Sequence, residues 1–293
     1  MRLGFIGYGE AAFEMSCGLY QEGLRETIAY DPLWDHPDFK QLIHDRAKQA
    51  NVQLLPTAKD VVQKANVLIV AVPADQAKHV SESIAPYLTT DHLYIDVSAS
   101  TPEIKQHIAG VVAHKNGLFV DAAMMGSLPA YKHQVPILAS GTGTDQFIQL
   151  MTPYHMNIEK VSDTAGDASA TKLIRSIFMK GIAALLIEML EAATHFKVDD
   201  RVIASVTETM NKDSFDTILN RLVTGTSIHS KRRAFELEGS LSMLDHAGLS
   251  SLMTKAAKEK LEQLTDYHLN DHFNGQTPDS WKEVIHQLAQ KRS

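Results

Sequence analysis

The chain has 293 residues, of which 44% are hydrophobic and 22% charged, a composition typical of folded globular proteins. Its net charge of −7 gives no indication of a nucleic acid or an acidic membrane as a partner. Cys17 is the only cysteine, which excludes an intrachain disulfide. No apolar run is long enough to span a bilayer, and the first expected strand starts at residue 3 with no signal peptide before it. We therefore expect a cytoplasmic protein.

The first segment combines a short apolar strand, Leu3 to Ile6, with a glycine-rich turn and a helical pattern. In this context Gly7-x-Gly9-x-x-Ala12 is typical of dinucleotide binding. Gly7 permits the tight turn, Gly9 lets the backbone approach a pyrophosphate, and Ala12 lets the helix pack on the strand. The phosphates then face the positive end of the helix dipole. The expected cofactor-binding residues of this turn are Gly7, Tyr8, Gly9, Glu10, Ala11 and Ala12.

The second expected strand, Thr27 to Asp31, ends on a carboxylate. Asp31 lies 22 residues after Gly9, a spacing that suits a bond to the ribose 2′-hydroxyl. A 2′-phosphate would be repelled, and the first lysine or arginine after Asp31 is Lys40. We therefore expect NAD as the cofactor, with NADP as the less favoured choice. The alternative is that Asp31 only starts the Asp31-Pro32 turn.

Strands and helices alternate through residues 1–163, which indicates a doubly wound, parallel Rossmann-type α/β domain. The apolar run Val67 to Val72, ended by Pro73, has no polar alternation and predicts a strand buried on both faces. Cofactors in such sheets lie at the carboxyl ends of the strands, so Val72, Pro73 and Ser98 are expected beside the nucleotide. Further expected strands are 52–55, 93–97, 118–122, 135–139 and 156–161, and expected helices are 38–50, 74–88, 102–114 and 145–154.

Residues 164–293 show only helical patterns and are expected to form an all-helical substrate and dimerisation domain. Asp167 to Phe196 predicts one helix of about 45 Å. Apolar residues cover most of its circumference, which predicts burial. Because this surface needs much cover, we expect a homodimer through the helical domain. The other expected helices are 201–210, 215–222, 227–247, 250–268 and 279–290.

Lys172 stands in the first turns of this long helix, and Arg175 and Ser176 share its face. A lysine on an apolar helix is costly unless it is paired or functional. Burial lowers the pKa of a lysine and so suits it to act as a general base. From spacing alone, a lysine that reaches solvent at a domain boundary is the commoner interpretation.

The order of the motifs resembles the β-hydroxyacid dehydrogenase family, which includes 6-phosphogluconate and 3-hydroxyisobutyrate dehydrogenases. The motifs are the glycine turn, Asp96 to Pro102, Asp121 to Gly126, and Gly166-x5-Lys172. The second half, through His229 to Arg233, is similar to the branch with a phosphogluconate dehydrogenase-related C-terminal domain. The resemblance implies that Lys172 is the general acid/base. The substrate-pocket residues expected with it are Met125, Gly126, Ser127, Arg175 and Ser176.

The sequence departs from the family pattern near the expected substrate. The usual Ser-Gly-Gly loop is Met125-Gly126-Ser127, and the asparagine four residues past the lysine is Ser176. Ser98-Ala99 replaces the common Ser-Thr pair. Imine-reducing relatives lose the lysine, so the presence of Lys172 favours alcohol–carbonyl chemistry.

A short basic run in the helical domain offers candidate anchors for an anionic substrate group. Arg232 and Arg233 could bind such a group, but Arg232 can also pair with Glu236 on a solvated helix face. His268 and His272 have a spacing that suits two metal ligands, but the HExxH glutamate and a third ligand are missing, so we expect no metal.

Together these patterns predict an NAD(P)-dependent dehydrogenase that transfers hydride between the nicotinamide and a small, anionic β-hydroxy acid. Lys172 would take the hydroxyl proton. Two alternatives stay open: oxidative decarboxylation of a phosphogluconate-like substrate, and a non-catalytic NAD-binding regulatory protein.

Overall fold

The computed structural model describes residues 1–292. The chain divides into two compact units, of which unit 1 is Met1–Ile177 and unit 2 starts at Phe178. This division falls within one long helix. The expected boundary at 163 and 164 instead marks the point where strands cease to alternate with helices.

Unit 1 contains an eight-stranded sheet. Its strands are β1 (Leu3–Ile6), β2 (Ile28–Tyr30), β3 (Gln53–Leu54), β4 (Val67–Val70), β5 (Leu93–Asp96), β6 (Leu118–Met124), β7 (Ile137–Ser140) and β8 (Ile158–Ser162). They are arranged in the order β3-β2-β1-β4-β5-β6-β7-β8. β1, β4 and β5 are buried along their whole length, which explains their apolar sequences. The expected Rossmann-type fold is confirmed.

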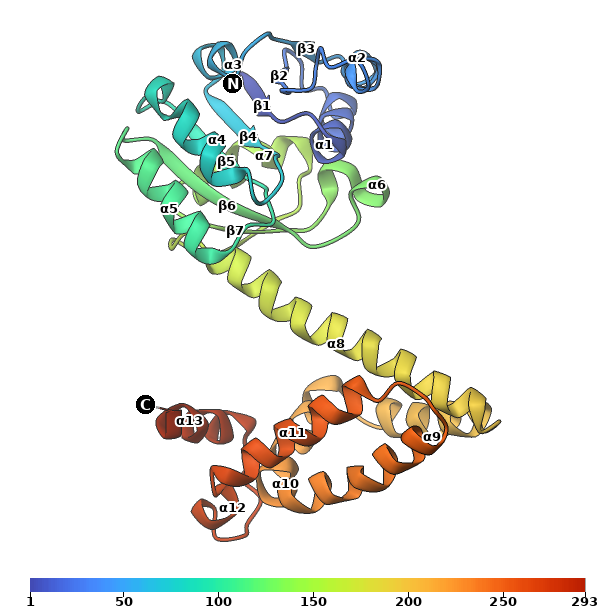
Figure 1. Ribbon diagram of the computed structural model, residues 1–293. Helices are drawn as coiled ribbons and strands as arrows, with labels where there is room; N and C mark the ends of the chain where they lie inside the picture. The colour runs from blue at the N-terminus through green and yellow to red at the C-terminus, as the bar shows by residue number, and fades with distance from the viewer. Residues whose placement is uncertain (293) are drawn as a thin grey trace. The chain divides into compact units, whose positions relative to one another are not determined.

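Helices cover both faces of this sheet (Figure 1). They are α1 (Glu10–Gln21), α2 (Lys40–Gln49), α3 (Ala58–Lys64), α4 (Ala77–Ile84), α5 (Pro102–Ala113), α6 (Leu128–Tyr131) and α7 (Thr144–Met151), with 3₁₀ turns η1 (Ala85–Tyr87), η2 (Lys132–Gln134) and η3 (Thr152–Tyr154). On one face, Met15 of α1 and Phe147 of α7 join the core around Phe5. On the other, Val61 of α3 and Ile108 of α5 join the core that contains Leu68. α3 is not among the helices expected from the sequence; it begins with a capping bond from the Asp60 N–H to the Thr57 side chain.

The last two strands run against the first six. β1 to β6 are parallel, whereas β7 pairs with β6 in the antiparallel sense and β8 pairs with β7 in parallel. The connection between β6 and β7 holds only α6 and η2, and antiparallel strands can be joined without a full crossover helix. β8 is the edge strand, as expected.

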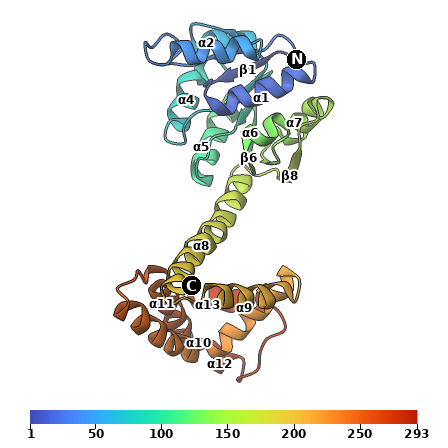
Figure 2. The ribbon, with the colours of Figure 1, turned by 90° about the vertical axis from the view of Figure 1, so that its right-hand side faces the viewer.

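Between residues 167 and 292 every regular element is helical. These are α8 (Asp167–His195), α9 (Asp199–Asn211), α10 (Phe215–His246), α11 (Leu252–Asp266), α12 (Leu269–His272) and α13 (Trp281–Arg292). The long helix expected over 167–196 is confirmed as α8, which Figure 2 shows without interruption. The two helices expected over 215–222 and 227–247 are wrong in detail. They form one helix, α10, with a kink at His229, where the Asn270 side chain donates a 2.9 Å hydrogen bond to the Ile228 carbonyl.

α8 is not buried as its composition predicts. The side chains of Ile174, Ile177 and Ile187 are 66%, 75% and 60% exposed in the single chain. Six further large apolar side chains of α8 are exposed by more than a third. The circumference of this helix is therefore apolar but only partly covered. Within the described chain, none of the helices has both the length and the apolarity to span a membrane.

A carboxylate on α8 caps another helix of unit 2. Glu188 accepts hydrogen bonds of 2.8 Å from the N–H groups of Met253 and Thr254, and one of 2.6 Å from the Thr254 hydroxyl. Burial opposes ionisation of this carboxyl, but these bonds outweigh it and lower its pKa. The first turn of α11 is thus capped from 65 residues away.

Candidate active site

Four parallel strands end side by side at one edge of the sheet, and the fifth, β6, continues beyond them to Met124. Their register places Tyr30, Ile6, Val70, Asp96 and Asp121 in one row across β2, β1, β4, β5 and β6. The residues that follow this row belong to the glycine turn, the Asp31 turn, the Val72-Pro73 turn and the Ser98 loop. The expected cofactor residues therefore meet at the carboxyl edge of the sheet, where α/β folds bind their ligands.

The glycine turn has the backbone geometry that its sequence requires. Gly7 adopts φ +83°, and a Cβ atom there would lie 2.4 Å from the Ala71 carbonyl oxygen. Around Gly9, by contrast, a Cβ would meet no atom within 4 Å. Gly9 precedes α1 without a side-chain cap, so the first N–H groups of α1 are available to an anion. Open space and uncapped donors at this turn fit a pyrophosphate.

Tyr8 contributes its backbone rather than its ring to this turn. Its ring is fully buried and its hydroxyl lies 2.7 Å from the Ser16 Oγ. Burial raises the pKa of Tyr8 far above its ordinary value, so the phenol stays neutral. Within the turn, the side chain is a core residue that packs against Phe5.

Asp31 is tied to the glycine turn. Its Oδ2 accepts a 2.7 Å hydrogen bond from the Tyr8 N–H, and its Oδ1 accepts one of 2.8 Å from the Leu33 N–H. The second bond is the local turn that the alternative interpretation anticipated, and the first spans 23 residues. Each oxygen of Asp31 retains a lone pair that can accept a further hydrogen bond. The two backbone contacts therefore do not prevent Asp31 from binding a ribose hydroxyl.

The loops after β4 and β5 are joined by serine hydroxyls. Ser98 Oγ lies 2.8 Å from Ser100 Oγ, which donates a 3.1 Å bond to the Ala74 carbonyl. The Ser98 N–H donates to Asp96 Oδ1 at 2.8 Å. Thr101 then caps α5, with its side chain accepting from the Ile104 N–H. Ser98 is thereby held beside the Val72-Pro73 turn.

A fully buried lysine lies beneath this loop. Lys105 of α5 donates a 2.9 Å bond to the Asp96 carbonyl oxygen, and its Nζ lies 3.3 Å from Asp96 Oδ2 and 3.3 Å from Asp121 Oδ1. All three side chains are 0% exposed. Removing one charge of such a buried group leaves the others uncompensated, which is strongly destabilising.

The start of α8 is attached to the same place. Ser169 donates to Asp121 twice, from its N–H at 2.8 Å and from its hydroxyl at 2.7 Å. The Ala168 N–H donates to Ser140 Oγ at 3.0 Å. Before them, Gly166 has φ +98° and packs so closely on Pro102 that a Cβ would lie 2.9 Å from its carbonyl oxygen. The first turn of α8 is therefore fixed on β6, β7 and the start of α5.

Lys172 lies three residues beyond Ser169, on the same face of α8. Lys172 and Ser176 are half-buried, and Arg175 is exposed. The Met125 N–H donates to the Pro136 carbonyl at 2.7 Å, and Gly126 and Ser127 are exposed where β6 ends. The row of strand ends, the Met125 loop and the helix with Lys172 all belong to unit 1.

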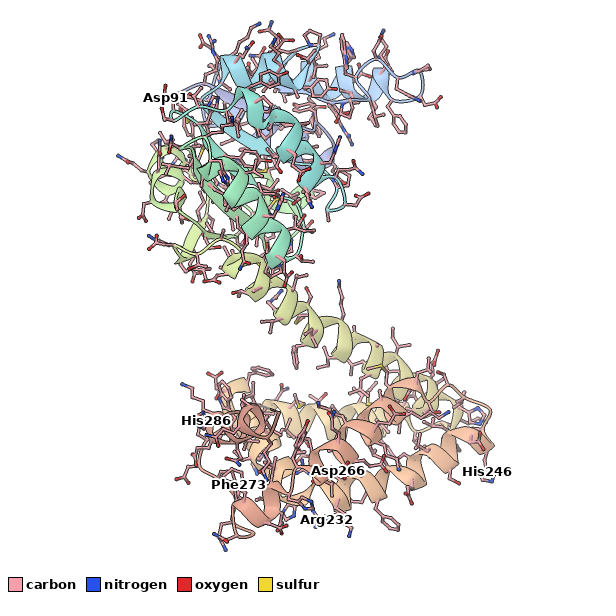
Figure 3. All side chains as sticks on the ribbon, turned by 60° about the vertical axis from the view of Figure 1, so that its left-hand side comes forward. Asp91, Arg232, His246, Asp266, Phe273 and His286 are labelled. Carbon is pink, nitrogen blue, oxygen red and sulfur yellow. The ribbon has the colours of Figure 1, made fainter. Side chains whose placement is uncertain are left out.

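The candidate anion anchors lie in unit 2. Arg232, labelled in Figure 3, is exposed on α10 and its Nε lies 3.4 Å from Glu236 Oε1, as the solvated-face alternative anticipated. Arg233 turns back along its own helix to the Thr226 hydroxyl. His268 has a left-handed backbone and is the N-cap residue of α12, which ends at His272. Among residues 1–292, no three histidine, cysteine or acidic side chains are placed to hold a metal ion.

Comparison with known proteins identifies both halves of the chain. Residues 2–154 match the NAD-binding domain of 6-phosphogluconate dehydrogenase, which is more than half of the chain. The chain belongs to this family. Residues 193–264 match a domain of unknown function, DUF1932.

Solved structures are similar to this member of the family over nearly its whole length. A conserved hypothetical protein from Sinorhizobium meliloti 1021 is 30% identical, with 99% of this chain and 96% of that chain covered and a TM-score of 0.64. A conserved protein of unknown function, described as similar to 3-hydroxyacid dehydrogenases, is 28% identical over 92% of this chain and 99% of that chain, with a TM-score of 0.63. An imine reductase from Streptomyces aurantiacus shares the fold at 14% identity, with 98% and 99% covered and a TM-score of 0.76. The NAD(P)-binding domain and the resemblance to 3-hydroxyacid dehydrogenases are thus confirmed.

The buried lysine, Lys105, is not among the site residues expected from the sequence. Lys105, Ile108 and Val112 recur at helical spacing, and all three are buried. A lysine in an apolar stripe, three residues after the proline that begins a helix, was the available signal. Its partners Asp96 and Asp121 each end an apolar strand segment, so the topology rather than the spacing brings them together.

Proposed function

We propose that this protein is an NAD-dependent oxidoreductase that transfers hydride between the nicotinamide and a small β-hydroxy acid. The observation that carries the proposal is the attachment of the lysine-bearing helix at the edge that holds the glycine turn. Ser169, one helical turn before Lys172, binds Asp121, and Asp121 stands in the same register row as Ile6, which precedes Gly7.

The proposed roles combine the geometry of unit 1 with the family resemblance. The first turn of α1 binds the pyrophosphate, and Asp31 binds the adenosine ribose. Val72, Pro73 and Ser98 line the nicotinamide end. When bound, NAD supplies the hydride acceptor. Lys172 removes the hydroxyl proton of the substrate, while Arg175, Ser176 and the Met125 loop shape the pocket.

NAD is preferred over NADP in this proposal because the Tyr8 and Leu33 N–H groups hold the negative charge of Asp31 at the turn. The neighbouring Lys40 is paired with Asp35 and does not offset the negative charge. Arg232 and Arg233 remain candidate anchors for the anionic end of the substrate.

The proposed assembly is a homodimer through α8. Together, the exposed apolar side chains of α8 form a larger apolar surface than a monomeric protein normally exposes to water. They are Leu173, Ile174, Ile177, Phe178, Met179, Leu185, Leu186, Ile187 and Leu190. A second copy of the chain would supply the missing cover.

The test combines a substrate screen with two lysine variants on the same helix. Small hydroxy acids are incubated with the protein and NAD, and NADH is followed by absorbance. Lys172→Ala should lower kcat by about 10²–10⁴-fold, the usual worth of a general base, while NADH affinity holds. Lys180→Ala, an exposed lysine two turns on, should behave as wild type. A near-wild-type rate in Lys172→Ala would remove this lysine from the mechanism, and release of CO₂ would identify the decarboxylating alternative.

A further inference from the structure

The geometry points to Lys105 as a positioning residue that holds the Ser98 loop and the start of α8 in one fixed arrangement. This role rests on the proposed function, because the helix it anchors carries Lys172. The coupling itself is a property of unit 1 and can be measured without a substrate.

Lys105, Asp96 and Asp121 form a buried group of charged side chains that joins α5, β5, β6 and α8. Lys105 is the cation of this group. Its Nζ contacts the carbonyl and carboxylate of Asp96 on β5 and the carboxylate of Asp121 on β6. The three side chains are 0% exposed, so these contacts are shielded from bulk solvent. Removal of the ammonium would leave two buried carboxylates without their cation.

Each aspartate has a second partner that faces the candidate site. Asp96 Oδ1 accepts the Ser98 N–H, and Asp121 accepts both the N–H and the hydroxyl of Ser169. Ser98 and Ser169 are themselves 6% and 3% exposed. One lysine thus fixes, through two carboxylates, the loop on the cofactor side and the first turn of α8.

The charge of Lys105 explains why this one residue fixes both the Ser98 loop and the first turn of α8. Asp96 and Asp121 are directly paired neighbours in the β5–β6 register. Without the ammonium between them, two buried carboxylates would face each other with no cation to offset their repulsion. Asp121 would then be displaced from Asp96, and it could no longer hold both groups of Ser169 as it does now.

We call the contacts through Asp96 to Ser98 the Ser98 arm, and those through Asp121 to Ser169 the α8 arm. Three variants separate these two arms. Lys105→Met keeps the aliphatic stem without the charge. Ser169→Ala removes one hydroxyl on the α8 side and leaves the Ser98 arm intact. Lys115→Met, at an exposed lysine just after α5, is the matched control. Amide hydrogen exchange by mass spectrometry reports on residues 166–177, and NADH titration reports on the cofactor side.

We expect Lys105→Met to raise exchange at the start of α8 by about tenfold or more, and to weaken NADH binding, because both arms lose their anchor. Ser169→Ala should raise exchange in 166–177 but leave the NADH dissociation constant unchanged. Lys115→Met should change neither.

Two results would overturn this role. In one, Lys105→Met raises exchange evenly over β1, β2 and α8, which would mean that the lysine only stabilises unit 1. In the other, exchange over 166–177 is unchanged in both Lys105→Met and Ser169→Ala. Failure of the proposed function is a separate outcome: wild-type protein would then bind no NADH, or Lys172→Ala would keep its rate, while the exchange pattern still reports the coupling.

Discussion

The carboxylate of Asp31 accepts a 2.7 Å hydrogen bond from the backbone N–H of Tyr8. The end of β2 and the middle of the glycine turn are thereby held together, 23 residues apart in the chain. This bond orients the carboxylate at the edge of the sheet before any ligand binds.

Replacing Asp31 should change the choice of cofactor. Asp31→Ala removes the ribose acceptor and the negative charge, so NADH affinity should fall by about 10–100-fold, the worth of a charged hydrogen bond. NADPH affinity should fall less, since the repulsion of the 2′-phosphate is relieved at the same time. Fluorescence titration with both nucleotides measures the ratio. Asp38→Ala makes the same charge change at an exposed position of the same segment and should leave the ratio unchanged. An unaltered ratio in Asp31→Ala would assign Asp31 to the turn alone.

Two glycine-to-alanine changes should have opposite effects. Gly7→Ala places a Cβ 2.4 Å from the Ala71 carbonyl in a left-handed backbone, which alone costs about 1–2 kcal/mol. We expect lower stability of unit 1 and loss of NADH binding. Gly181→Ala, in the interior of α8 with open space around it, should instead stabilise by about 0.5–1 kcal/mol. Thermal unfolding and NADH titration check both. Tight NADH binding by Gly7→Ala would show that the turn tolerates a side chain.

The capping carboxylate of Glu188 should give stability that depends on pH. Its pKa is lowered in the folded protein, so its stabilisation is fully present above the unfolded value of about 4.3 and is lost as the pH falls through the folded value. Glu188→Gln should therefore cost about 1.5–3 kcal/mol at neutral pH and progressively less in acid. Urea unfolding at several pH values measures this difference. Glu191→Gln, at an exposed position of the same helix, is the control. A pH-independent cost would mean that the charge does not matter to the cap.

The uncovered face of α8 predicts the oligomeric state. Sedimentation at micromolar concentration should give about twice the chain mass of 32.4 kDa. Ile187→Asp should shift the mass toward the monomer, because a charge buried in an apolar interface is costly. Ile187→Leu keeps the apolar area and should stay dimeric. A monomeric wild-type protein would refute the homodimer.

Much of unit 1 could be predicted because local signals and tertiary structure agree there. The unbroken apolar run of β4 and the turn at Gly7 each specify their own geometry. The antiparallel sense of β7 could not be predicted, because a strand's sequence does not encode the direction of its neighbour. The kink of α10 lies at His229 rather than between the expected helices 215–222 and 227–247. Beside it, the Ile228 carbonyl accepts a bond from Asn270, a contact between residues distant in sequence that local patterns do not encode.

The residues of the candidate site also divide into those that the sequence predicts and those that it does not. The glycine turn and Asp31 are visible in sequence because each acts through its own backbone and spacing. The contacts of Lys105 are not, since they depend on a register that brings Asp96 beside Asp121. Lys172 was singled out by resemblance, and what the structure adds is the attachment of its helix one turn earlier.

The reversed strand β7 has a consequence for how this fold can be divided. Because β7 runs against β6, Ser140 lies opposite Asp121, and the two together receive the first free amides of α8. A nucleotide-binding fragment cut after β6 would keep every cofactor contact proposed for the glycine turn, but it would lose both Ser140 and the helix that carries Lys172. Chimeras between relatives should therefore exchange residues 118–177 as one block, since Asp121 and Ser140 together accept the first amides of α8.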